Sequence, residues 1–104
     1  MISDFKQIKQ WIQKKQYLIA YHAKLRLVER FITTIEMENA IINDEIIEEY
    51  PGDEPCPSVL ILGFIKNKPL HIVIGMCEDH LRIITVYIPT KEKWIKYRKR
   101  RDII

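Results

Sequence analysis

The chain has 104 residues, 47% of them hydrophobic and 30% charged, which is enough for one domain spanning residues 1–104. No stretch approaches the roughly 18 consecutive apolar residues that a membrane span needs. The first residues are charged and polar and lack the apolar core of a secretory signal, so we expect a cytoplasmic protein. Two cysteines, Cys56 and Cys77, are too few for a disulfide framework or a four-ligand zinc site.

The net charge of +3 conceals a strong segregation along the chain. Residues 1–30 and residues 91–104 each carry seven Lys or Arg against two acids, whereas residues 31–55 carry eight acids and no Lys or Arg. An electropositive surface of this kind attracts phosphate groups. The alternative is that these cations belong to solvated helix surfaces without a ligand.

Helical spacing of apolar residues begins at the N-terminus. Phe5, Ile8, Trp11 and Ile12 recur at this spacing, which predicts a helix to about Gln16. Lysines and glutamines fill its other face.

A second helix is expected from His22 to Phe31, because Ala23, Leu27 and Phe31 form an apolar stripe at helical spacing. Between the two helices, residues 17–20 are apolar and β-prone. They form either a brief strand or a connection.

A third helix has a clear start signal. Thr33 and Glu36 fit a capping box, and Ile32 and Met37 occupy the two positions of a hydrophobic staple. The helix should cover residues 34–43. Its expected core residues are Met37, Ala40 and Ile41.

From Glu45 the apolar period changes to two, and four β-rich runs follow at residues 46–50, 59–66, 70–77 and 81–88. The last two gaps are so short that they predict antiparallel hairpins. Thr90 then caps an expected basic C-terminal helix. The predicted fold class is α+β, with the N-terminal helices packed on a three- to four-stranded antiparallel sheet that is followed by this helix.

A row of potential cations follows the second helix. His22, Arg26 and Arg30 recur every four residues and therefore share one face. Two guanidiniums on successive turns can hold a phosphate or carboxylate, and a histidine one turn away can transfer a proton. The competing interpretation is that the arginines form ion pairs with Glu48 and Glu49.

The C-terminal segment mixes cations with aromatic residues, a combination that suits RNA because bases stack on rings while cations hold phosphates. The candidate nucleic-acid-binding residues are Lys91, Lys93, Trp94, Tyr97, Arg98, Arg100 and Arg101. The alternative is a helix that docks its aromatic residues on the sheet and leaves its lysines in water.

The three histidines, His22, His71 and His80, show no zinc-site spacing together with the cysteines. There is also no glycine-rich phosphate loop. We therefore expect neither a bound metal nor an organic cofactor.

Four short motifs occur in order through residues 20–95. They are His22-x3-Arg26-x3-Arg30, Glu45-Ile-Ile-Glu-Glu-Tyr50-Pro51, Pro69-Leu-His71-Ile-Val and Ile84-Thr85-Val86-Tyr87. In these motifs the segment resembles the bacterial family catalogued as domain of unknown function 4258. Phe31 stands where a glycine would be common in that family.

That family is similar to RelE and BrnT toxins, the small ribonucleases of toxin–antitoxin pairs. The resemblance implies a RelE-like fold, an RNA substrate and an antitoxin partner, which in such families is often of zinc-finger type. It nominates the matched positions His22, Arg26, Arg30, His71 and Tyr87 as catalytic.

The implied reaction is metal-free RNA cleavage, in which the ribose 2′-hydroxyl attacks the adjacent phosphorus. His22 or Tyr87 would carry protons, and Arg26 and Arg30 would stabilise the developing charge. The alternative function is a non-catalytic module that binds a partner protein or nucleic acid through its basic face.

Overall fold

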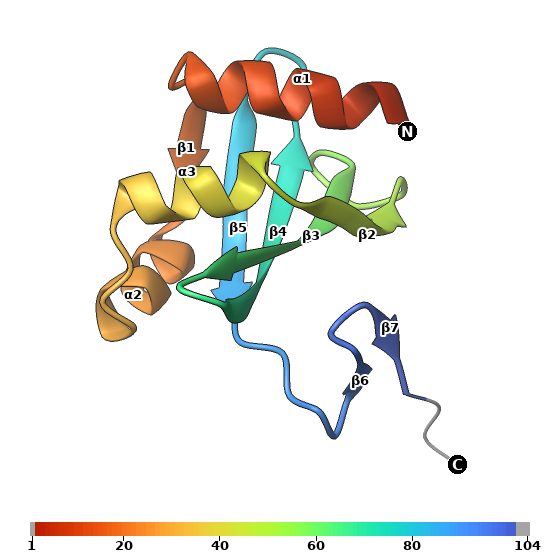
Figure 1. The fold of residues 1–104 in the computed structure, drawn as a ribbon. Helices are drawn as coiled ribbons and strands as arrows, with labels where there is room; N and C mark the ends of the chain where they lie inside the picture. The colour runs from red at the N-terminus through yellow and green to blue at the C-terminus, as the bar shows by residue number, and fades with distance from the viewer. Residues whose placement is uncertain (1, 102–104) are drawn as a thin grey trace.

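The computed structural model describes residues 2–101, which form three helices and seven strands (Figure 1). In chain order these are α1 (Ile2–Gln13), β1 (Tyr17–Ile19), α2 (Tyr21–Glu29), α3 (Thr34–Ile42), β2 (Glu45–Tyr50), β3 (Ser58–Ile65), β4 (Lys68–Met76), β5 (Leu81–Tyr87), β6 (Trp94–Ile95) and β7 (Lys99–Arg100).

The main sheet has five strands in the order β1-β5-β4-β3-β2. Strands β2 to β5 are antiparallel neighbours, whereas β1 pairs with β5 in parallel, so the sheet is mixed. The predicted fold class, helices on a three- to four-stranded antiparallel sheet, is therefore wrong.

The parallel edge strand depends on contacts between distant parts of the chain. β1 has only three residues, and the backbone N–H of Ala20 donates to the carbonyl of Ile83 at 2.9 Å. Leu81 donates to the carbonyl of Gln16 at 3.2 Å on the same edge. A segment this short has no strand preference strong enough to predict such pairing from its own residues.

The predicted C-terminal helix is also wrong, because β6 and β7 form a two-stranded hairpin. Lys96 and Tyr97 have φ values of 51° and 65°, and the N–H of Arg98 closes the turn on the carbonyl of Ile95 at 3.1 Å. A helix here would have only Trp94 and its neighbours to bury, and a short helix without a continuous apolar face is marginal.

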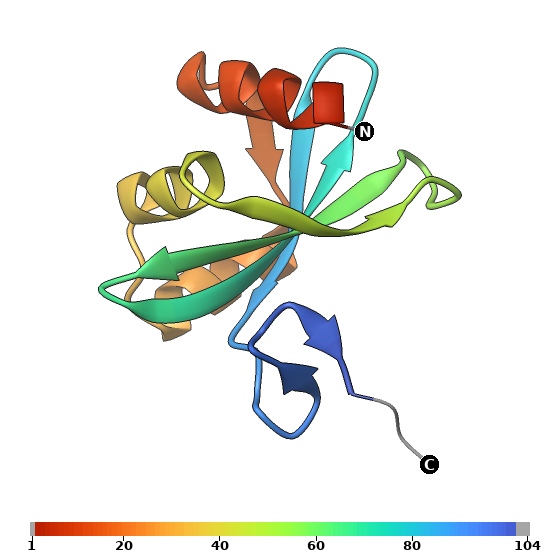
Figure 2. The same ribbon diagram turned by 45° about the vertical axis from the view of Figure 1, so that its right-hand side comes forward.

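The three helices share one core with one face of the sheet, and the C-terminal hairpin lies apart from them, as Figure 2 shows. Ile8 and Ile12 come from α1, Met37 and Ile41 from α3, and alternate residues from the strands complete the core. The opposite, helix-free face of the sheet carries the intervening residues of each strand.

The α3 start signal is confirmed, because Glu36 donates its backbone N–H to the Thr33 hydroxyl and its carboxylate accepts from the Thr33 N–H. α3 then buries Met37, Ala40 and Ile41 as expected. It lies directly on β3 at Gly63, where an added Cβ would be 2.5 Å from the Ala40 carbonyl oxygen. Only glycine permits this close approach.

Phe31, the last residue of the predicted apolar stripe, does not lie on the second helix. Ala23 and Leu27 are buried, but α2 ends at Glu29 and Phe31 adopts a φ of 56° in the following loop. The Phe31 side chain is consequently 92% exposed instead of joining the core.

A disulfide between Cys56 and Cys77 joins the loop after β2 to the end of β4, a link that the sequence analysis did not predict. A disulfide persists in oxidising compartments, so in a reducing cytoplasm this pair of cysteines would be two thiols.

Within residues 2–101, none of the helices has the length and apolar character to cross a membrane.

We predict that Gly63→Ala lowers the free energy of unfolding by about 1–3 kcal/mol, because the new methyl group overlaps the α3 backbone. Urea denaturation measures the change. Gly52→Ala is the matched control, since nothing lies within 4 Å of its added Cβ. Equal stability of the Gly63→Ala variant and the wild type would contradict the close contact.

We predict that reducing the disulfide lowers the free energy of unfolding by about 3 kcal/mol, because it links residues 21 positions apart and restricts the unfolded chain. Urea denaturation with and without a thiol reductant tests this. The Cys56→Ser/Cys77→Ser variant should match the reduced protein and ignore the reductant. A wild type indifferent to reductant would show that the bond contributes nothing.

Candidate functional site at the C-terminal hairpin

A polar cluster occupies the helix-free face of the sheet where the C-terminal hairpin meets it. In the strand register His71 lies between Leu62 on β3 and Tyr87 on β5. The next row places Glu48 of β2 opposite Leu60. Because side chains of paired residues point to the same face, these positions share one surface.

His71 is fully buried and has a partner on each ring nitrogen. Its Nε2 lies 2.6 Å from the Tyr97 carbonyl oxygen, and its Nδ1 lies 3.1 Å from the Tyr87 hydroxyl. A carbonyl can only accept, so Nε2 carries the proton. In the neutral ring Nδ1 is then free to accept the Tyr87 O–H.

Trp94 anchors the hairpin over this histidine. Its ring meets the imidazole edge to face with centroids 4.4 Å apart, and the Arg100 guanidinium lies 4.7 Å over the indole. The indole is only 3% exposed as a result. Trp94 therefore acts as a packing anchor of the hairpin and offers little surface on which a base could stack.

Arg100 joins the hairpin to β2. Its Nε and Nη2 donate to the two Glu48 carboxylate oxygens at 2.9 Å and 3.1 Å, a fork contact, and Nη2 lies 3.4 Å from the Tyr50 hydroxyl. The Tyr50 hydroxyl also donates to Glu48. Nearby, Arg98 pairs with Glu45.

These contacts set the protonation states of the cluster. Burial lowers the pKa of His71, although its bond to the Tyr97 carbonyl opposes this. Burial raises the pKa of Tyr87. Burial alone would also raise the pKa of Glu48, but hydrogen bonds from Arg100 and Tyr50 outweigh it and hold that pKa below its usual range. The cluster at neutral pH thus contains a neutral imidazole beside an ion pair.

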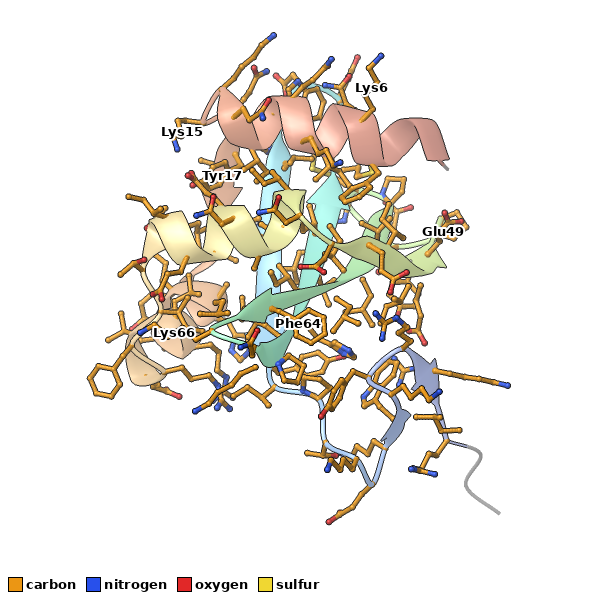
Figure 3. The ribbon with its side chains drawn as sticks, in the orientation of Figure 1. Lys6, Lys15, Tyr17, Glu49, Phe64 and Lys66 are labelled. Atoms are coloured by element: carbon orange, nitrogen blue, oxygen red, sulfur yellow. A yellow bond between two sulfur atoms is a disulfide. The ribbon has the colours of Figure 1, made fainter. Side chains whose placement is uncertain are left out.

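A hollow of about 460 Å³ lies beside the cluster, where the hairpin meets Phe64 of β3. Aromatic and cationic side chains line it together: Phe64, Lys91, Trp94, Lys96, Tyr97, Arg98 and Arg101. Figure 3 labels Phe64, which projects from β3 towards the hairpin. Since Phe64 and Tyr97 are half-buried, they offer more ring surface than Trp94 does.

The proposed nucleic-acid residues divide in the structure. Lys91, Trp94, Tyr97, Arg98 and Arg101 line the hollow. Lys93 is exposed outside this lining, and Arg100 turns inward to Glu48. Phe64 and Lys96 were not among the residues nominated from the sequence. Alternation along β3 puts Phe64 on the face of Leu62, so the period of two was a usable signal for it.

The His22, Arg26 and Arg30 row lies elsewhere. His22 and Arg26 are on α2, which packs with the core on the other face of the sheet, and Arg30 is the residue that follows this helix. Arg26 pairs with Glu29 of its own helix at 3.1 Å, and Glu48 is held by Arg100. In the described part of the chain neither arginine forms an ion pair with Glu48 or Glu49, so that alternative is wrong. The structure brings His71 and Tyr87 together and separates them from this row.

The remaining candidate ligands are dispersed. His80 is bound to its neighbour Asp79 at 2.7 Å in the turn before β5. Within residues 2–101, no three His, Cys, Asp or Glu side chains come close enough together to hold a metal ion.

Comparison with known proteins gives one family. The family described as domain of unknown function (DUF4258) matches residues 19–88, which include β2 to β5 and both His71 and Tyr87. The match ends before the C-terminal hairpin. No curated protein and no solved structure matches the chain.

We predict that acidification destabilises the protein through His71. Its folded pKa lies below the ordinary value of 6.5, so the unfolded chain binds the proton first and stability falls as pH drops through that range. Urea denaturation from about pH 7.5 to about pH 5 measures this loss.

The control is His71→Gln, which keeps a donor but cannot titrate in this range. This variant should have a lower free energy of unfolding than the wild type at about pH 7.5. It should lose less of that free energy on acidification than the wild type does. Parallel pH profiles for the two proteins would show that His71 is not buried as a neutral ring.

Proposed function

This chain belongs to the DUF4258 family, and we propose that it binds single-stranded RNA in the hollow at its C-terminal hairpin. The observation that carries the proposal is the lining, in which half-buried Phe64 and Tyr97 alternate with Lys91, Lys96 and Arg101. Unpaired bases stack on such rings while the cations neutralise the backbone, and stacking contributes about 1–3 kcal/mol per base.

The positive charges of the hairpin support binding of a polyanion in this hollow. Arg98 and Arg100 are engaged by Glu45 and Glu48. Lys91 and Lys96 are exposed and project around the hollow, and Arg101 uses its Nε on the Lys91 carbonyl, which leaves its charge uncompensated by that contact. The hairpin thus keeps part of its charge for a ligand after the fold is made.

Cleavage is the second candidate, and the Tyr87–His71 hydrogen bond favours it. The 2′-hydroxyl proton would pass to the Tyr87 oxygen while the Tyr87 proton passes to His71 Nδ1. The 2′-oxygen then attacks phosphorus, the bond to the 5′-oxygen breaks, and that oxygen takes a proton from water. The hydroxide that remains takes back the proton held by His71 through Tyr87, which restores both residues. This would be the toxin-like ribonuclease activity implied by the resemblance to RelE and BrnT toxins.

The nominated catalytic residues divide accordingly. His71 and Tyr87 serve the relay, whereas His22, Arg26 and Arg30 have no part in it, because α2 packs on the opposite face of the sheet. No metal or organic cofactor enters this scheme.

We predict that Lys91→Gln/Lys96→Gln weakens binding of an unstructured single-stranded RNA and reduces the slope of log affinity against log salt by about 1.4, since two phosphate contacts are lost. Fluorescence anisotropy over a salt series measures both. The control is Lys6→Gln/Lys14→Gln, which removes the same charge from α1 and the turn that follows it. Figure 1 shows α1 at the opposite end of the molecule from the hairpin, and Figure 3 labels Lys6 on it. Equal losses of RNA affinity in the two variants would mean that positive charge attracts the RNA without a specific site.

We predict that Tyr87→Phe leaves RNA affinity unchanged and lowers any cleavage rate by about 10²–10⁴-fold, the contribution of one proton carrier. Gel analysis of end-labelled RNA gives the rate. Full cleavage by the variant would exclude the relay. A wild type that binds RNA and never cuts it would leave the binding module as the function.

A further inference from the structure

The outer side of α2 is apolar and exposed. Tyr21, Leu25 and Val28 recur at helical spacing on it, and Phe31 and Ile35 continue the row into the next loop and the first turn of α3. We call these five residues the α2 apolar face. Val28, Phe31 and Ile35 are 72%, 92% and 68% exposed, so the row is not part of the core in the described part of the chain.

Packing of the core does not require these exposed apolar side chains. α2 already buries Ala23 and Leu27 on its inner side, so the outer apolar residues add nothing to that packing. Phe31 stands in the left-handed region with a φ of 56°, where a bulky residue is disfavoured and glycine or asparagine is preferred. A large exposed apolar side chain in such a position is better explained by a binding surface than by folding.

A hollow of about 420 Å³ continues the α2 apolar face. Phe31 and Ile32 form one wall, and Ile65, Leu70 and Ile88 from the sheet form the other. Lys66, labelled in Figure 3, stands at the β3–β4 turn on its rim. The surface therefore combines an apolar ridge with an adjoining recess, the shape that receives the side chains of a helix.

The charged residues around this recess differ in the contacts that they already make. Of its two acids, Glu29 pairs with Arg26, and Glu36 caps α3 through Thr33 while its negative charge lies near Lys66. Its three cations are Arg30, Lys66 and Lys68, all exposed. The lining therefore keeps a positive balance of charge towards a ligand.

We propose that the α2 apolar face and this recess bind an amphipathic helix of a partner protein, with apolar anchors at i, i+4 and i+7 flanked by Asp or Glu. The acidic flanks would meet Arg30, Lys66 and Lys68, which favours this occupant over a second copy that would bring the same cations together. The site lies on the helix side of the sheet, so it is independent of the proposed RNA hollow.

A phage-displayed library of helical peptides with randomised exposed positions tests the proposal, using the purified full chain as bait. Selected peptides should carry apolar residues at i, i+4 and i+7 and an excess of Asp and Glu beside them. Absence of enrichment, or enrichment without the acidic excess, would overturn it.

Matched variants then locate the site. Val28→Ser and Phe31→Gly should each weaken the best selected peptide by about tenfold or more, the effect of losing an interface anchor. Phe31→Gly suits the backbone at that position, so loss of folding does not explain the result. Ile95→Ser, which changes an exposed apolar residue on β6, should have no effect. Equal binding by all three variants would overturn the site.

Two further experiments test the preference for acidic peptides and the identity of the bound partner. Lys66→Glu/Lys68→Glu should abolish the preference for acidic peptides, whereas Lys6→Glu/Lys14→Glu should keep it. Sedimentation velocity should show a monomer. A dimer that Phe31→Gly dissociates would overturn the proposal by assigning the face to a second copy. RNA affinity is unaffected by Phe31→Gly if the two sites are independent, so failure of either proposal is recognised separately.

Discussion

The C-terminal hairpin depends on the burial of one imidazole. His71 lies on a central strand of the sheet, and both of its nitrogens need partners once water is excluded. Tyr87 supplies one within the sheet, but the other is the backbone carbonyl of Tyr97, which belongs to the hairpin. Two strands of two residues have no independent stability, and the exposed ion pairs at Glu45 and Glu48 contribute little alone. The hydrogen bond and the Trp94 contact are what hold the hairpin on the sheet.

This arrangement explains how the two faces of a small sheet take separate roles. One face packs against three helices and makes nearly the whole core. The other needs only a short hairpin to cover its polar cluster, and that hairpin borders an open hollow together with Phe64 of β3. Because Trp94 and Tyr97 touch both His71 and the hollow, a ligand in the hollow would contact the same segment that covers the imidazole. One structural element therefore borders both the hollow and the His71 cluster.

The sequence predicted the features that short-range chemistry determines. The capping box at Thr33 set the start of α3, and short gaps indicated the antiparallel neighbours among β3, β4 and β5. A brief strand at residues 17–20 was one of two alternatives from the sequence, but its parallel pairing and the hairpin were not predicted. Distant partners make both, the edge of β5 for the first and His71 for the second. Of the site, His71 and Tyr87 were nominated from motifs. Glu48, Tyr50 and Phe64 needed the register of the sheet before they could be joined to the cluster.

The segregated charge of the chain has a structural meaning that net charge hides. Part of the acidic middle meets part of the basic C-terminus, with Glu45 on Arg98 and Glu48 on Arg100. The C-terminal cations thus divide by role. Arg98 and Arg100, at alternate positions, pair with acids of β2. Lys91 and Lys96 line the hollow, and in the described part of the chain neither forms an ion pair with an acid of β2. A positive site beside an internally neutralised cluster can attract a polyanion without disturbing the ion pairs that build the site, which is the condition a small basic binding surface has to meet.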